Sequence, residues 1–167
     1  LLANTPFVAC YCDLDFFKPF NDTYSYRKGD EMIQLTSRIL SWGCDPKSDF
    51  IGHVGGDDFI LLLQSKDWKT RCENALRSFE QAASLLFKEE HLAAGGYSSE
   101  GRDGVVRFHP LTSLSIGVIQ ITPGQFLSHH EVSTAMNEAK KMAKKIAGNS
   151  LFIEQRNSAN NQKGKSK

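Results

Sequence analysis

The stretch FIGHVGGDDFILLLQ, residues 50–64, holds two short apolar runs on either side of two glycines and two aspartates. Phe50 to Val54 and Phe59 to Gln64 have the lengths and residue types of β-strands. The glycine pair between them supplies the backbone freedom of a tight turn. The stretch therefore predicts a β-hairpin that carries two adjacent carboxylates, Asp57 and Asp58, at its turn.

A second apolar run, Phe7 to Tyr11, leads into Asp13-Leu14-Asp15 and predicts a buried strand with Asp13 at its end. One interpretation is structural, because aspartates often cap turns. The other is chemical, because a metal–triphosphate site needs hard oxygen ligands on a rigid backbone, with open positions for phosphate oxygens. Magnesium ions between Asp13 and the hairpin carboxylates would activate a hydroxyl and stabilise a leaving pyrophosphate. Spacing alone leaves both interpretations open.

The rest of the chain alternates helical and strand-like segments. Gly29-Asp30 is expected to begin a helix with Asp30 as its N-cap, and Asp67 is expected to begin a longer helix. Leu111 to Ile121 and Leu151 to Ile153 are predicted strands. Ala94 to Gly104 is polar and glycine-rich, which predicts an exposed hairpin or loop. The mixture of helices and returning strands predicts an α+β fold, an α/β sandwich on one mixed sheet.

A capping box, Ser128 to Glu131, predicts the start of the last long helix. Its spacing predicts the inward positions, which are Val132, Ala135, Met136, Ala139, Met142, Ala143 and Ile146.

Composition bounds the class of protein. The 167 residues suit one domain, and no apolar run approaches the roughly 20 residues that a spanning helix needs. A net charge of +1 gives no field for nucleic acid or a membrane surface. Reduced structural cysteines and a cytoplasmic location are expected, with the thiols of Cys10 and Cys12 on opposite faces of their strand. Because it begins with Leu1, the sequence is interpreted as a piece of a longer protein.

Four motifs, in order and spacing, resemble the GGDEF (diguanylate cyclase-type) domain family. They are Asp13-Leu14-Asp15-Phe16-Phe17-Lys18-Pro19-Phe20-Asn21-Asp22, Lys28-Gly29-Asp30, Gly55-Gly56-Asp57-Asp58-Phe59 and Leu114-Ser115-Ile116-Gly117-Val118. The resemblance implies a GGDEF domain over residues 1–155, with residues 156–167 as a disordered polar tail. It also implies a central mixed, mostly antiparallel sheet, like that of the polymerase palm and of nucleotide cyclases.

The family condenses two GTP molecules into cyclic di-GMP and two pyrophosphates, with Mg²⁺ or Mn²⁺, between two facing domains of a homodimer. The resemblance implies that Asp13 and Asp57 are the catalytic carboxylates and metal ligands. It adds the carbonyl of Leu14 and the carboxylate of Asp58 to the metal site. Asp15 is expected to be a structural carboxylate.

The resemblance also assigns the GTP contacts. The phosphates are expected to bind the amides of Phe16 and Phe17 and the ammonium groups of Lys18 and Lys144. The guanine base is expected to bind Asn21 and Asp30. Each assignment has a simpler alternative, since Lys18 could be only a solvated lysine and Asp30 only an N-cap.

The sequence departs from the family pattern at several positions. Asp58 replaces the usual Glu, which shortens its reach by one methylene. Ser25-Tyr26 replaces Gly-His, and His53 replaces a common Arg. Gly148 stands where an Arg follows the lysine, here Lys144, by four residues, so one phosphate-binding cation is absent.

Two further departures concern regulation. A product-inhibition motif of the family, Arg-x-x-Asp, is here Pro46-Lys47-Ser48-Asp49, so Asp49 fits and the arginine is absent. The segment 88–109 is longer than the usual connection. It resembles GGDEF domains that accompany EAL phosphodiesterase and CBS domains in one polypeptide. Two functions follow: a diguanylate cyclase, at full or weakened activity, or a degenerate GTP-binding module that regulates a linked EAL or sensory domain.

Overall fold

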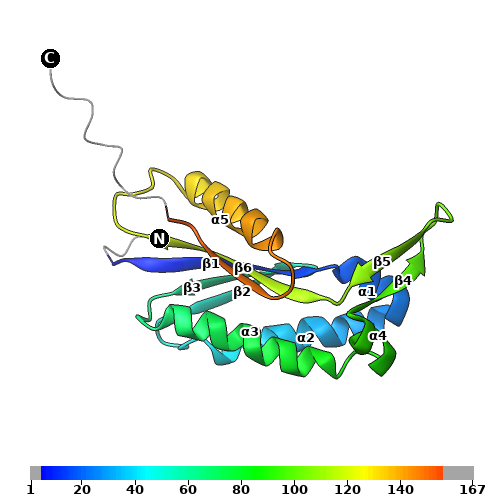
Figure 1. The fold of residues 1–167 in the computed structure, drawn as a ribbon. Coiled ribbons are helices and arrows are strands. Elements are labelled where there is room, and N and C mark those ends of the chain that lie inside the picture. The colour runs from blue at the N-terminus through cyan, green and yellow to red at the C-terminus, as the bar shows by residue number, and fades with distance from the viewer. Residues whose placement is uncertain (1–4, 156–167) are drawn as a thin grey trace, which may run out of the picture.

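The computed structural model describes residues 5–155. Within them, five strands form the central sheet in the order β2-β3-β1-β6-β7 (Figure 1). Their bounds are β1 (Phe7–Asp15), β2 (Phe50–Gly55), β3 (Asp58–Leu63), β6 (Ser113–Ile121) and β7 (Ser150–Ile153). β1 pairs antiparallel with β3 and β6, β2 pairs antiparallel with β3, and β6 pairs parallel with β7. The predicted mixed, mostly antiparallel sheet is confirmed.

Helices cover both faces of this sheet. α2 (Tyr26–Trp42) and α3 (Trp68–Ser84) lie on one face, and α5 (His129–Lys144) lies on the other (Figure 1). α1 (Phe17–Tyr24) and α4 (Glu89–Ala94) lie at one end of the molecule. Beside them, β4 (Gly96–Glu100) and β5 (Val106–Pro110) form a separate hairpin that projects from the body, which confirms the predicted exposed hairpin.

Successive side chains of β1 point to opposite faces of the sheet, so one set lies in the hydrophobic core and the other faces α5. Cys10 and Cys12 are fully buried in the core under α2 and α3, whereas Tyr11 and Asp13 face α5. The prediction that the two thiols point to opposite faces is wrong, because residues two apart in a strand share a face. All four cysteines carry free thiols, as expected.

The start of α2 differs from the prediction. The helix begins at Tyr26, and the Ser25 hydroxyl accepts a hydrogen bond from the Lys28 amide at 3.2 Å. Asp30 is therefore not the N-cap and lies within the helix. Ser25 has a φ of 146°, a region that favours glycine, so this junction between α1 and α2 carries backbone strain.

The capping box of α5 is confirmed, because the Ser128 hydroxyl accepts from the Glu131 amide at 3.3 Å. Two of the predicted inward positions are wrong, since Met142 and Ile146 are 40% and 46% exposed. The helix ends at Lys144, and the buried part of its face is narrower than the periodicity indicated. The residues buried on that face are Ala135, Met136, Ala139 and Ala143.

Within residues 5–155, no helix combines the length and the apolar composition that crossing a membrane requires. The predicted tail, residues 156–167, lies outside the described residues.

A buried aspartate ties the start of β2 to the end of β3. The fully buried side chain of Asp49 accepts hydrogen bonds from the amides of Asp45 and Gln64, both at 2.8 Å, and contacts Arg71 at 3.4 Å. Burial acts to raise the pKa of Asp49, but these donors outweigh it and hold the pKa below its usual value. The charged form is therefore stabilised by folding.

Asp49→Ala is expected to lower the free energy of unfolding by about 1–3 kcal/mol, because it leaves these donors without their charged partner. Since the folded-state pKa is lowered, the contribution of the charge is present above the unfolded pKa of about 4 and is lost as pH falls through the folded pKa. Urea unfolding at several pH values should show the gap between wild type and Asp49→Asn closing in acid. Asp67→Asn is the matched control, because Asp67 pairs with the same Arg71 but is 61% exposed. If Asp49→Asn and Asp67→Asn were equally stable at pH 7, the stabilising role assigned to the Asp49 charge would be contradicted.

Candidate active site

Three carboxylates meet where β1 runs beside the β2–β3 turn. Asp13, Asp57 and Asp58 each present one oxygen atom, and these atoms lie within 4.8 Å of one another. Asp13 pairs with Asp58 across the antiparallel register, and the Leu14 amide donates to the Asp57 carbonyl at 3.3 Å. Strand and turn are therefore one rigid unit. A cluster of hard oxygen ligands at this spacing fits Mg²⁺ or Mn²⁺.

The turn itself is held in a defined shape. Gly55 and Gly56 have φ values of 140° and 56°, which side chains rarely adopt. The His53 ring stacks on buried Phe59 with centroids 4.7 Å apart, and its Nε2 donates to the Gly56 carbonyl at 2.8 Å. A histidine thus fixes the turn at the position where the family commonly has arginine.

The carboxylates are crowded enough to change their acidity. Burial raises the pKa of Asp13, the hydrogen bond and charge of Lys144 oppose that shift, and the charge of Asp57 adds to it. Burial also raises the pKa of Asp58, as does the neighbouring charge of Asp13. Concentrated negative charge of this kind favours the binding of a divalent cation.

Lys144 is the cation that balances this charge in the structure. Its Nζ lies 2.7 Å from Oδ2 of Asp13 and 2.9 Å from Oδ1 of Asp15. Burial acts to lower the pKa of Lys144, but the two carboxylates outweigh it and raise the pKa above its usual value. Asp15 also accepts the hydroxyls of Ser113 and Ser115, both at 2.7 Å, so it is a structural carboxylate, as predicted.

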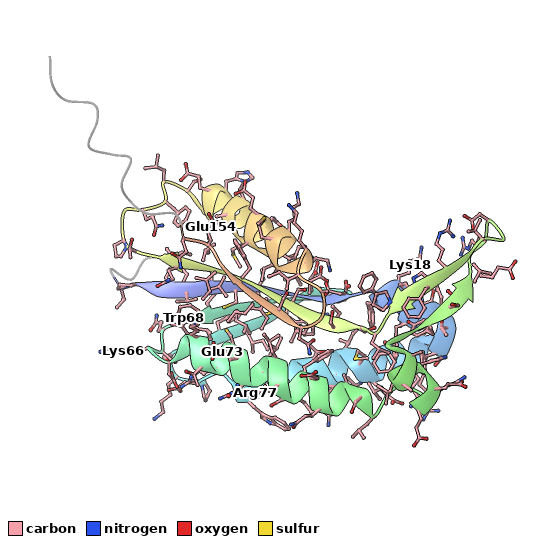
Figure 2. The ribbon with its side chains drawn as sticks, in the orientation of Figure 1. Lys18, Lys66, Trp68, Glu73, Arg77 and Glu154 are labelled. Carbon is pink, nitrogen blue, oxygen red and sulfur yellow. The ribbon has the colours of Figure 1, made fainter. Side chains whose placement is uncertain are left out.

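Three of the residues predicted to bind phosphate lie at the start of α1, and the fourth, Lys144, is the last residue of α5. Phe16 has a φ of 56° and immediately precedes the helix, and Phe17 and Lys18 form its first turn. The first amides of a helix have no partner within it and point outward, which suits an anion. Figure 2 shows exposed Lys18 at the end of the molecule where α1 and the β4–β5 hairpin meet.

The two residues predicted to bind guanine come from different helices. Asn21 of α1 packs against Gly29 of α2, the residue before Asp30. A Cβ atom at Gly29 would lie 1.6 Å from Oδ1 of Asn21, so only glycine allows this approach. Asp30 is exposed at this junction and its carboxylate is open to a ligand.

Sequence reasoning missed two residues of the site. The Tyr11 hydroxyl donates to Oδ2 of Asp58 at 3.1 Å, and Nζ of Lys140 lies 4.1 Å from the centroid of the Tyr11 ring. The available signals were spacing in a strand, because Tyr11 precedes Asp13 by two, and spacing in a helix, because Lys140 precedes Lys144 by one turn.

Known proteins resemble this chain in sequence and in fold. The family model described as diguanylate cyclase, GGDEF domain, matches residues 2–97. The probable diguanylate cyclase DgcT of Escherichia coli (strain K12) is 35% identical over 150 residues, which are 90% of this chain and 30% of DgcT. The chain thus spans about a third or less of the length of curated relatives that it matches.

Solved structures share the fold. The GGDEF domain of YfiN (also named TpbB) from Pseudomonas aeruginosa is 21% identical with a TM-score of 0.64, and the match covers 93% of this chain and 86% of that one. An EAL/GGDEF domain protein from M. capsulatus is 19% identical with a TM-score of 0.61, over 92% and 88% of the two chains. Motifs, sheet topology and family match agree, and the chain belongs to the GGDEF family of diguanylate cyclase domains.

Proposed function

We propose that this domain condenses GTP into cyclic di-GMP, with pyrophosphate as the second product and Mg²⁺ or Mn²⁺ as cofactor. The observation that carries the proposal is the cluster of Asp13, Asp57 and Asp58 on rigid backbone. It lies at the end of the central strand β1, from which α1, with its phosphate-binding amides, begins. A bound divalent cation beside the free amides of a helix N-terminus suits an anion such as GTP.

Different residues of the chain hold the metal and orient the triphosphate. Asp13 and Asp57, with the Leu14 carbonyl and Asp58, hold the metal, which when bound neutralises the charge of the phosphates and lowers the pKa of the attacking hydroxyl. The first turn of α1 and Lys18 orient the triphosphate. Positioning of this kind supplies most of the catalysis in phosphoryl transfer.

Lys144 has a second task in this proposal. Bound GTP presents phosphate oxygens to a cation that is otherwise paired with Asp13 and Asp15. Asp13 would hold the metal, which would supply positive charge at that carboxylate, and Lys144 would then be available to bind the phosphates. Lys144 thereby links occupation of the metal site to binding of the GTP phosphates.

Turnover requires two copies of the domain. Each domain binds one GTP, and the 3′-hydroxyl of each GTP attacks the α-phosphorus of the other. Two phosphodiester bonds form, two pyrophosphates leave, and the two hydroxyl protons are released. A homodimer with facing sites is therefore the proposed catalytic unit, located in the cytoplasm, where GTP is available.

Asp30→Ala is expected to weaken GTP binding by about tenfold or more, because a hydrogen bond to a charged group contributes about 1.5–3 kcal/mol. Asn21→Ala is expected to weaken it by about fivefold, because a hydrogen bond between neutral groups contributes about 1 kcal/mol. Binding of ATP should be weak in wild type and unchanged in both variants, since adenine lacks the N–H pattern that a carboxylate accepts. Isothermal titration with both nucleotides measures this. Glu31→Ala, which changes a partly buried neighbour of Asp30 that pairs with Lys28, is the matched control. Unchanged GTP affinity in both site variants would place the base elsewhere.

A second candidate is a GTP-binding module that regulates a linked EAL or sensory domain without turnover. The observation that favours it is Gly148, which has a φ of 78° and no side chain at the position of the second phosphate-binding cation. Incubation with GTP and Mg²⁺, followed by mass spectrometry of the nucleotides, separates the candidates. The cyclase yields cyclic di-GMP, whereas the module binds GTP and returns it unchanged.

A further inference from the structure

The contact between Tyr11 and Asp58 joins the metal cluster to the face of the sheet under α5. The Tyr11 hydroxyl donates to Oδ2 of Asp58 at 3.1 Å. An aspartate carboxylate is short, and its terminal torsion is broad when nothing holds it. One oxygen fixed by Tyr11 defines the plane of the carboxylate and leaves the other oxygen for a cation shared with Asp13 and Asp57.

Tyr11 is itself fixed by α5. Nζ of Lys140 lies 4.1 Å above the centre of its ring, a cation–π contact. The reason lies in the β1–β6 register, where Tyr11 is paired with Gly117. The backbone of α5 passes so close to Gly117 that a Cβ there would lie 2.3 Å from the Lys140 amide nitrogen. The register therefore places Lys140 next to Tyr11.

The contacts of Lys140 with Tyr11 and of Tyr11 with Asp58 favour a role at the metal site over a role in packing alone. A phenylalanine would fill the same space under α5, so the ring alone does not require a hydroxyl. That hydroxyl donates to a carboxylate of the cluster at 3.1 Å, so its removal changes the metal site and leaves the packing under α5 in place.

We propose that Tyr11 and Lys140 are positioning residues that orient Asp58 as a ligand of the divalent cation and thereby set the affinity of the site for metal. This proposal rests on the proposed function, because it assigns Asp58 to the metal. Neither residue touches the nucleotide or the reacting atoms. The two act through Asp58, and the effect of changing them is specific to metal affinity.

Tyr11→Phe removes only the hydroxyl and is expected to weaken Mn²⁺ binding by about tenfold, the lower end of what lost hydrogen bonds to metal ligands usually cost. Lys140→Met keeps the length of the side chain and removes its charge, with an expected loss of about threefold. The maximal rate should recover at high Mg²⁺ concentration in both variants. The defect therefore appears in the metal concentration for half-maximal rate and not in kcat.

Two matched controls separate this role from folding. Tyr97→Phe also removes a buried tyrosine hydroxyl, one that has no hydrogen-bond partner among residues 5–155. Lys141→Met removes the exposed lysine next to Lys140. Both controls should bind Mn²⁺ like wild type.

The experiment measures Mn²⁺ binding by electron paramagnetic resonance, with thermal unfolding of each variant and cyclic di-GMP formation over a range of Mg²⁺ concentrations. Tyr11→Phe with wild-type Mn²⁺ affinity would overturn the proposal. If Tyr11→Phe fails to fold, Lys140→Met decides, and equality with Lys141→Met overturns the proposal. Wild type that binds Mn²⁺ but forms no cyclic di-GMP refutes the cyclase function alone, and the loss in Tyr11→Phe still supports the positioning role.

Discussion

Asp57→Asn is expected to lower the rate of cyclic di-GMP formation by about a thousandfold, which corresponds to about 4 kcal/mol of transition-state stabilisation. Asp57 is one of three carboxylates whose oxygens lie within 4.8 Å, and it belongs to the turn that the Leu14 amide ties to β1. An amide oxygen is a weaker ligand and carries no charge. The remaining carboxylates would hold the metal less tightly, and the site would supply less stabilisation to the reacting hydroxyl.

The fold should survive this change. The charge of Asp57 raises the pKa of Asp13, so the two carboxylates repel each other in the folded protein. Removal of that charge is expected to leave the free energy of unfolding unchanged or slightly higher. Rates, Mn²⁺ binding and thermal unfolding measured on one preparation separate the effects. Asp22→Asn, an exposed aspartate on α1, is the control. Wild-type activity in Asp57→Asn would show that the cluster is not the catalytic centre.

Gly117→Ala is expected to lower the free energy of unfolding by about 3 kcal/mol, at the upper end of the cost of overpacking a core. A Cβ at Gly117 would lie 2.3 Å from the Lys140 nitrogen, 2.4 Å from the Ala139 carbonyl carbon and 2.7 Å from its oxygen. These are backbone atoms and cannot rotate away. The helix α5 must therefore move off β6, and it takes both Lys140 and Lys144 with it.

The same substitution is expected to reduce activity in the fraction that remains folded, because Lys144 loses its place 2.7 Å from Asp13. Urea unfolding gives the stability, and the rate below the unfolding transition gives the activity. Gly43→Ala is the control, since a Cβ there meets its nearest atom at 3.5 Å, an ordinary contact. Equal stability of the two variants would contradict the close approach of α5.

The parts of the fold that could be predicted from sequence depend on local signals. The turn with Asp57 and Asp58 follows from a glycine pair between two apolar runs. The start of α5 follows from a hydroxyl and a carboxylate three residues apart. The start of α2 could not be predicted in this way, because Ser25 adopts a φ of 146° that its residue type disfavours.

The site likewise contains contacts that a local sequence pattern predicts and contacts that it does not. Asp13 could be placed near the turn because antiparallel pairing brings a strand end beside a hairpin. The contacts of Tyr11 with Asp58 and of Lys140 with Tyr11 depend on the register of β1 and on how closely α5 approaches Gly117. No pattern within one segment contains that information. The exposure of Met142 likewise depends on how much of α5 the sheet covers.

The measurement that tests the account most directly is the amount of cyclic di-GMP that the wild-type domain forms from GTP, with and without Mg²⁺, at increasing protein concentration. We predict cyclic di-GMP and pyrophosphate in a molar ratio of one to two, with no product when the metal is chelated. The rate should rise more steeply than protein concentration, because two domains must face each other. GTP bound with intact affinity but recovered unchanged at the highest concentration would contradict a working cyclase centre at Asp13, Asp57 and Asp58.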